Sequence, residues 1–271
     1  MQDTDHRGRV DGQVTVIIGG SSGFGLATAE RLAEEGATVI IAGRRGDAAE
    51  EAAAPLGGWG MACDATDHDS VGALVDAVVE RHGTVDIGMN CAGYARSTRI
   101  ADLTPDVLQP MVDVQFVGAI WAMKHLCNAM AASGGGSMIN VSSLTAHNPS
   151  PGHAAYAGSK AGIEYVTRIA AVEYGAGNVR VNTIAAHLIE TPMTAGLFQD
   201  RIKLEAVRQQ TPLGRMGDVR DIANCALYLA SDEGAYVSGE TINVDGAASS
   251  QKLPSTAEYD MIEQTRPDLR D

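Results

Sequence analysis

The sequence predicts an α/β protein in which helices cover both faces of a doubly wound parallel sheet of about seven strands. Short β-branched runs alternate with segments of helical periodicity along most of the chain. A glycine-rich turn joins the first such run to the first helix. Of the 271 residues 45% are hydrophobic, but only three are Phe and two Trp, so Ala, Val, Ile and Leu must form the core. That composition suits buried parallel strands under Ala-rich helices.

The first strand–helix–strand unit lies at residues 13–42. A β-branched strand at 13–18 stops at glycines, and a helix then continues to Glu35 and ends at Gly36. The next strand is expected at 38–42. The crossover of such a unit is almost always right-handed, which places the helix on one defined face of the sheet.

The alternation continues to the end of the predicted domain. Further strands are expected in a short segment ending at Cys63-Asp64 and at 85–90, 137–141, 179–185 and 241–244. Further helices are expected at 48–54, 67–82, 106–132 (bent by Pro110), 154–174, 201–209 and 219–229. These elements predict one domain at 13–246, with extensions at 1–12 and 247–271 and an irregular substrate loop at about 186–215.

Composition and charge restrict the class of protein. A net charge of −14 argues against nucleic acid or a membrane surface as the main partner. The scattered cysteines form no CxxC or Cys/His cluster, so neither a metal site nor a disulfide framework is expected. The chain shows no signal-peptide pattern and no apolar run of transmembrane length. We therefore expect a soluble cytoplasmic protein.

The glycine turn is a candidate phosphate site. Gly19, Gly23 and Gly25 stand between a strand and a helix with the spacing G-x-x-x-G-x-G, which allows a tight turn and close approach of a ligand to the backbone. Free amides and the dipole of the helix N-terminus suit a pyrophosphate. The alternative is a strand–helix turn without a ligand. The candidate binding residues of the turn are Gly19, Ser21, Ser22, Gly23, Phe24 and Gly25.

Two arginines follow the second strand. An acidic residue near this point holds the ribose hydroxyls in proteins that prefer NAD, but here Arg44 and Arg45 come first and the nearest acid is Asp47. Guanidinium groups can pair with a 2′-phosphate. NADP(H) is therefore favoured over NAD(H), unless both arginines are merely solvated charges.

Tyr156 and Lys160 form a candidate acid–base pair. They are four residues apart on an expected helix, so their side chains share one face. A free phenol, with a pKa of about 10, is a weak acid–base group at neutral pH, and an adjacent ammonium should lower that pKa. On their own, the two residues are better explained as a surface Tyr and a solvated Lys.

Together these motifs resemble the short-chain dehydrogenase/reductase family, over about residues 13–246. The glycine turn is similar to the family's TGxxxGxG turn, with Ile18 in place of the Thr, and Tyr156–Lys160 is similar to its YxxxK motif. Ser143 precedes Tyr156 by 13 positions, as the catalytic Ser does in that family. Segments 90–93, 212–215, 238–241 and 244–246 fit the same pattern, which implies a Rossmann-type fold.

The resemblance implies a catalytic group of Ser143, Tyr156 and Lys160. Tyr156 would act as general acid–base, Lys160 would lower its pKa and hold the nicotinamide ribose, and Ser143 would bind the substrate oxygen. Ser142 is the rival of Ser143, but it should face the other side of an extended segment. Further implied cofactor contacts are Asp64, Ala65, Asn90, Ala92, Gly93, Ala186, Ile189 and Thr191.

Two departures from the family pattern concern the site. Gln115 stands where the family has an Asn in a proton relay, so it either keeps a shifted relay or only fills space. Ala186-His187 replaces the usual Pro-Gly after the sixth strand. His187 could touch cofactor or substrate, or point to solvent.

The expected substrate is a secondary alcohol or ketone in a largely apolar, alicyclic or steroid-sized pocket. The candidate substrate residues are Leu144, His153, His187, Met193 and Leu197. A 3-oxoacyl-thioester reductase is the alternative enzyme, and a non-catalytic nucleotide sensor or scaffold the alternative of another class. The helices at 106–132 and 154–175 resemble the family's tetramer interface, which implies a homotetramer, with a dimer as alternative. The tail beyond Gly246 is expected either to cover a neighbouring subunit or active site, or to be disordered.

Overall fold

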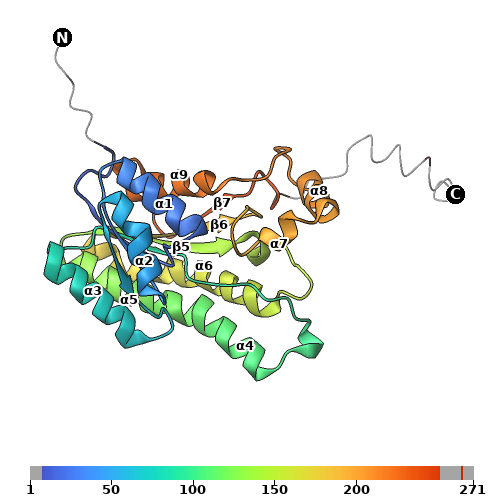
Figure 1. Cartoon of the computed structure of the whole chain (residues 1–271), viewed down its shortest axis with the longest axis horizontal. Helices are drawn as coiled ribbons and strands as arrows, with labels where there is room; N and C mark the ends of the chain where they lie inside the picture. The colour runs from blue at the N-terminus through green and yellow to red at the C-terminus, as the bar shows by residue number, and fades with distance from the viewer. Residues whose placement is uncertain (1–7, 251–263, 265–271) are drawn as a thin grey trace, which may run out of the picture.

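The computed structural model describes residues 8–250 and residue 264, and it contains a seven-stranded parallel sheet between two layers of helices (Figure 1). The strand order is β3-β2-β1-β4-β5-β6-β7. The winding direction therefore reverses between β1 and β4, which creates the crevice where ligands bind in such sheets. The predicted Rossmann-type fold class is confirmed.

The strands are short and lie close to their predicted positions. Their bounds are β1 (Val14–Ile18), β2 (Thr38–Gly43), β3 (Trp59–Ala62), β4 (Ile87–Asn90), β5 (Gly136–Ser143), β6 (Val179–Ala186) and β7 (Thr241–Val244). β5 and β6 extend further than predicted and end together, with Ser143 paired to Ala186. This register brings the residues that follow both strands to the same edge of the sheet.

The α-helices are α1 (Gly23–Glu34), α2 (Gly46–Ala53), α3 (His68–His82), α4 (Pro105–Val112), α5 (Gly118–Ala132), α6 (Ala154–Tyr174), α7 (Ala195–Phe198), α8 (Arg201–Gln209) and α9 (Val219–Ala230). Local sequence explains several ends. Asp67 caps α3 by accepting from the backbone of Asp69 and Ser70, and Gly83 ends it in the left-handed conformation.

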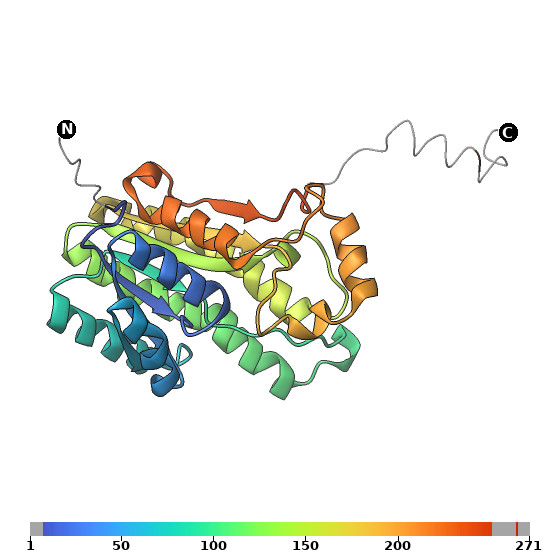
Figure 2. The same cartoon turned by 45° about the horizontal axis from the view of Figure 1, so that its top comes forward.

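Each face of the sheet has its own apolar core. One core joins the sheet to α1, α2 and α9, with Leu32, Ala49 and Leu227 fully buried. The other joins it to α3, α5 and α6, with Leu74 and Leu126 fully buried. Figure 2 shows α1 and α9 on one side of the sheet, opposite the α5 and α6 layer.

The single long helix expected at 106–132 is interrupted. Between α4 and α5 the chain forms one π-helical turn, Asp113–Val117, which carries Gln115. Pro110 lies within α4, three residues before this turn. A π-turn adds a residue to the helical repeat and re-aims the side chains after it, and such turns are frequent at functional sites.

The structure describes part of the N-terminal extension and very little of the C-terminal one. Val10, within the segment expected to be an extension, is 1% exposed, and Arg9 forms an ion pair with Glu233 at 2.9 Å. The tail expected to cover a neighbouring subunit or to be disordered lies, from residue 251 on, almost wholly outside the described residues. Within the described part of the chain, none of the helices has the length and apolar character needed to cross a membrane.

Candidate functional site

A single cavity of about 1480 Å³ opens at the carboxyl edge of the sheet, and its lining includes residues from the ends of β1, β4, β5 and β6. Every predicted site residue except Asn90 lines it. Asn90 is 5% exposed and its Oδ1 accepts from the amide of Ala92 at 3.2 Å. The Asn90 side chain therefore shapes the turn that follows β4, and its predicted cofactor contact stays a prediction.

The glycine turn packs tightly and leaves the start of α1 uncapped. Gly19 has φ +80°, and a Cβ there would lie 2.7 Å from the amide nitrogen of Ala92. A Cβ on Gly25 would lie 2.5 Å from the carbonyl oxygen of Gly19. Among the described residues, no side chain caps α1 and no acidic residue occupies its first turn. The first amides of α1 thus stay available to an anion, as a bound pyrophosphate requires.

Arg44 and Arg45 lie exposed at the other end of the cavity. Neither forms an ion pair with any residue that the structure describes. Hydrogen bonds from Thr66 hold the pKa of Asp64 below its usual value, and the nearby charge of Arg44 contributes. The two guanidinium groups remain free to meet a phosphate.

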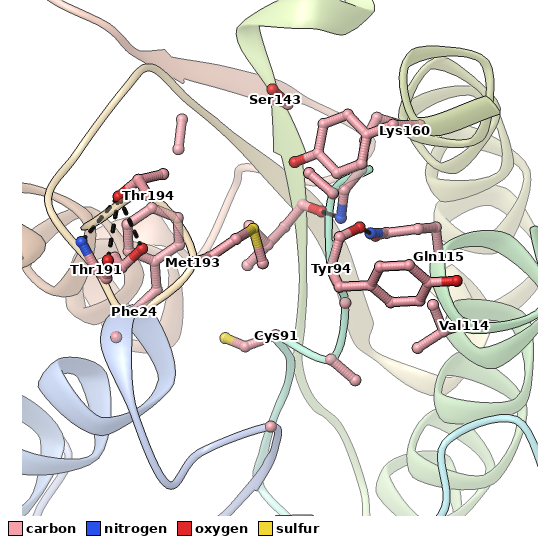
Figure 3. Close-up of a pocket in the computed structure, with 18 of the residues that line it drawn as sticks. Phe24, Cys91, Tyr94, Val114, Gln115, Ser143, Lys160, Thr191, Met193 and Thr194 are labelled. Atoms are coloured by element: carbon pink, nitrogen blue, oxygen red, sulfur yellow. Dashed lines mark hydrogen bonds between the residues drawn. The ribbon is translucent and has the colours of Figure 1, made fainter. Parts of the chain in front are cut away.

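Tyr156, Lys160 and Glu164 follow one another at intervals of four residues on α6, so they form one stripe. Lys160 Nζ donates to the carbonyl oxygen of Val141 at 2.7 Å and lies 5.7 Å from the centre of the Tyr156 ring. Burial lowers the pKa of Lys160 to about 8. In Figure 3, Ser143, Lys160 and Gln115 lie on one side of the pocket, and Phe24 and Thr191 on the other.

The expected lowering of the Tyr156 pKa by Lys160 is not found. Burial raises the pKa of Tyr156 above its ordinary value, and a hydrogen bond with the Ser143 hydroxyl acts in the opposite direction. The ammonium of Lys160 faces the ring of Tyr156 and the carbonyl of Val141, and is itself desolvated. In the protein without cofactor, Tyr156 is therefore a protonated phenol.

Ser142 faces away from the reaction side, as its position one residue before Ser143 predicts. Ser142 Oγ donates to Glu164 Oε1 at 2.5 Å, and His147 Nε2 lies 3.2 Å from the same oxygen. Glu164 is 8% exposed. This buried acid, which sequence reasoning missed, ties the strand end and the loop on either side of Ser143 to α6.

Gln115 is held by a hydrogen bond to the segment that follows β4. Its Nε2 donates to the carbonyl oxygen of Tyr94, and within the described chain its Oε1 has no hydrogen-bond partner. A Cβ on Gly93 would lie 2.7 Å from that Oε1, so Gly93 makes room for the longer side chain. Gln115 therefore supports the segment after β4 and leaves one buried acceptor.

A hydrogen-bonded turn arranges Thr191. Thr194 Oγ1 donates to the carbonyl oxygen of Ile189 at 2.6 Å and lies 2.9 Å from the Thr191 amide and 3.1 Å from Thr191 Oγ1 (Figure 3). Because Thr194 has only one hydroxyl proton, Thr191 must donate to it. The lone pairs of Thr191 Oγ1 remain for a donor in the cavity. The spacing of the two threonines was a signal that sequence reasoning did not use.

The substrate side of the cavity is mixed in character. Leu144, Met193 and Leu197 line it as predicted, and His153 lies there with its ring centre 6.4 Å from that of Tyr156. His187 also lines it and does not simply point to solvent. Lining residues that sequence reasoning missed are Cys91, Tyr94, Val114, Thr194, Val207 and Gln210.

The parallel sheet, its switch-point cavity and the open glycine turn define a Rossmann-type protein with a nucleotide-sized site. Comparison with known families gives a match over residues 19–248 to the family model described as enoyl-(acyl carrier protein) reductase. The chain belongs to the short-chain dehydrogenase/reductase family. It is therefore an oxidoreductase of the class that acts on alcohol- and ketone-type substrates.

Two curated relatives represent different substrates within the family. The 3-oxoacyl-[acyl-carrier-protein] reductase FabG of Thermotoga maritima is 35% identical over 243 residues, which is 88% of this chain and 98% of the relative. The 2,5-dichloro-2,5-cyclohexadiene-1,4-diol dehydrogenase LinX of Sphingobium indicum is 36% identical over 243 residues, 88% of this chain and 96% of the relative.

Solved structures show the same fold. A short-chain type dehydrogenase/reductase from Mycobacterium ulcerans has a TM-score of 0.86 and 32% identity, covering 96% of this chain and 98% of its own. A gluconate 5-dehydrogenase from Burkholderia cenocepacia, solved with NADP and tartrate, has a TM-score of 0.87 and 29% identity. The match covers 91% of this chain and 98% of the dehydrogenase.

Proposed function

We propose that this chain is an NADP(H)-preferring oxidoreductase that interconverts a secondary alcohol and a ketone on a compact, largely apolar substrate. The observation that carries the proposal is the placement of Ser143, Tyr156 and Lys160 in the wall of one cavity that also contains the open glycine turn. Its volume of about 1480 Å³ exceeds the usual size of a small-molecule pocket, so cofactor and substrate both have room.

The residues of this chain fit a nicotinamide dinucleotide. The turn at 19–25 would hold the pyrophosphate, Arg44 and Arg45 the 2′-phosphate, and Asp64 and Ala65 the adenine. Ala92 and Gly93 would line the adenosine ribose, Tyr156 and Lys160 would hold the nicotinamide ribose, and the carboxamide would meet Ala186, Ile189 and Thr191. The nicotinamide, when bound, gives or takes the hydride.

Tyr156 supplies the proton in the reducing direction. Its raised pKa keeps the phenol protonated at neutral pH, ready to donate to the carbonyl oxygen. The Ser143 hydroxyl donates to the same oxygen and stabilises the charge that develops there. In the oxidising direction the phenol must first lose its proton, and a cation at Lys160 favours the phenolate.

Cofactor preference follows from the two arginines. A reversal of charge, Arg44→Glu with Arg45→Glu, should weaken NADPH binding far more than NADH binding, because only NADPH carries the 2′-phosphate. Titration of NADPH and NADH fluorescence measures both affinities. Equal affinity of the native protein for the two cofactors would refute the preference.

A 3-oxoacyl-thioester reductase is the second candidate, favoured by the similarity to the FabG relative. A thioester on coenzyme A or on a carrier's phosphopantetheine arm brings anionic phosphate groups, and the net charge of −14 opposes their approach. Acetoacetyl-coenzyme A separates the candidates: turnover well above that of cyclic ketones would favour the thioester reductase.

The catalytic assignment is tested by following NADPH absorbance with a panel of ketones and secondary alcohols. Tyr156→Phe should abolish turnover and retain cofactor binding, because it removes only the hydroxyl. Turnover that survives this change would contradict the role of Tyr156. Binding of nucleotide without turnover of any ketone or alcohol would favour the sensor alternative.

Assembly as a homotetramer or dimer is part of the proposal. Tyr165, Ile169 and Val172 form an exposed apolar stripe on α6 and are 65%, 44% and 83% exposed. A second copy of α6 would bury this stripe. Light scattering after size exclusion measures the mass, and Val172→Glu should reduce it if the stripe is the interface.

A further inference from the structure

His187 is held beside the proposed catalytic serine. It is the first residue after β6, whose last residue Ala186 pairs with Ser143 across the sheet. The amide of His187 donates to the carbonyl oxygen of Val244 at 3.3 Å, which fixes its backbone against β7. Neighbouring strands lie about 5 Å apart, so the backbone of His187 lies next to the end of β5, which carries Ser143.

The hydrogen bonds of Thr211 determine which ring nitrogen of His187 carries a proton. Thr211 Oγ1 donates its only proton to the carbonyl oxygen of Val207 at 3.0 Å. His187 Nε2 lies 3.2 Å from the same hydroxyl oxygen, so Nε2 must be the donor of that contact. Burial lowers the pKa of His187, with the charge of Asp245 opposing, so the neutral ring is favoured. A neutral ring protonated at Nε2 has a lone pair on Nδ1.

That Nδ1 lone pair has no partner within residues 8–250. The only side-chain hydrogen bond of His187 among these residues is the one from Nε2, and the residue lines the cavity. The lining of this cavity includes apolar residues such as Leu188, Met193 and Val207 and polar ones such as Gln210. Nδ1 is the ring nitrogen of His187 that is left to accept a hydrogen bond there.

We propose that His187 Nδ1 accepts a hydrogen bond from a second hydroxyl group of the substrate, so that the preferred substrates are hydroxyketones and the matching diols. This inference rests on the proposed function, since it concerns a second oxygen on the same alcohol or ketone. Ser143 and His187 line the same cavity, and the two strands that carry them end side by side, so one compact substrate can meet both residues. An acceptor demands a donor, so a hydroxyl is selected over an ether or a second carbonyl.

Three ketones test the hydrogen bond directly: cyclohexanone, 4-hydroxycyclohexanone and 4-methoxycyclohexanone. With saturating NADPH, kcat/KM for the hydroxyketone should exceed that for the methoxyketone at least about tenfold, because only the hydroxyl can donate to Nδ1. Cyclohexanone should resemble the methoxyketone. A hydroxyl-to-methoxy ratio near one in the native protein overturns the proposal, and turnover of all three ketones would then leave the proposed function standing.

Variants assign the preference to Nδ1. His187→Asn places an amide oxygen near the position of Nδ1 and should retain much of the ratio, whereas His187→Phe fills similar space without an acceptor and should reduce the ratio to about one. NADPH fluorescence shows that each variant is folded. If His187→Phe does not fold, Thr211→Val removes the partner of Nε2 and should lower the ratio severalfold. The proposal is overturned if the hydroxyl-to-methoxy ratio is unchanged in His187→Phe. If His187→Phe does not fold, an unchanged ratio in Thr211→Val overturns it. Failure of all three ketones in the native protein overturns it together with the proposed function.

Discussion

Replacing Lys160 by Met should change the stability of the cofactor-free protein in a way that depends on pH. Lys160 is 6% exposed and burial lowers its pKa to about 8, against about 10.4 in an unfolded chain. At pH 7 the folded state must keep a buried ammonium, which costs about 3 kcal/mol relative to the unfolded state. Met has a similar length and no charge, so it removes this cost.

The pH dependence follows from the direction of the shift. The folded pKa lies below the unfolded pKa, so the destabilisation is fully present below about pH 8 and disappears as the pH rises past about 10.4. Between pH 7 and pH 10 the stability of the native protein relative to Lys160→Met should therefore rise by about 2.5 kcal/mol. The carbonyl of Val141 loses its donor in the variant, at a cost of about 1–3 kcal/mol, but that cost does not vary with pH.

The assay compares thermal midpoints of the native protein and the variant at pH 7 and pH 10, without cofactor and at one protein concentration. For a chain of this size the change in the difference should be about 5–10 °C. Lys203→Met is the matched control, because Lys203 is 69% exposed in an ion pair with Asp200 and should give a difference almost independent of pH. A difference between the native protein and Lys160→Met that stays constant from pH 7 to pH 10 would refute the reasoning.

Three further predictions concern residues around the proposed catalytic group. Glu164→Ala leaves the Ser142 hydroxyl and His147 without their shared acceptor, so kcat should fall about tenfold or more while cofactor affinity changes little. Glu164→Gln keeps an acceptor oxygen and should recover part of the lost kcat. An equal loss of kcat in both variants would contradict the hydrogen-bonding role of Glu164. Thr194→Val removes the acceptor of the Thr191 hydroxyl, so the dissociation constant of NADPH should rise about fivefold or more. Thr194→Ser keeps the acceptor and should leave the dissociation constant unchanged. Fluorescence titration measures both constants. Because the pKa of Tyr156 is raised above the ordinary value of about 10, ketone reduction should keep its rate from neutral to mildly alkaline pH and fall only at higher pH, whereas alcohol oxidation should increase with pH. Parallel pH–rate profiles in the two directions would argue against Tyr156 as the proton carrier.

The sequence predicts the sheet and most helices because their signals are local. Gly19, for example, needs a positive φ and tolerates no Cβ, and both requirements appear in the G-x-x-x-G-x-G spacing. The π-turn at 113–117 has no such local signal. Its Gln115 donates to Tyr94, which is 21 residues away, so the turn is stabilised by a contact that periodicity cannot reveal.

The sequence predicted which residues line the candidate site better than it predicted the contacts that their side chains make. Nearly all candidate residues line one cavity because strand ends meet at one edge of a parallel sheet. The partners of their polar atoms depend on side-chain directions in space. Glu164 could have been found from its spacing on α6, but its contact with His147 joins a helix to an irregular loop. The side chain of Asn90 turns back to the amide of Ala92, and this contact is likewise not visible in the sequence motif.

The raised pKa of Tyr156 and the lowered pKa of Lys160 have one main physical cause, which is burial of both groups. Neither group is tuned for proton transfer by the other in the free protein, because Nζ faces a carbonyl and a ring face. The proposed binding of ribose hydroxyls by Lys160 would give its ammonium new acceptors and a reason to stay charged. A charged Lys160 next to Tyr156 then favours the phenolate. On this argument the cofactor completes the acid–base pair as well as supplying the hydride, and the order of binding should be cofactor before substrate.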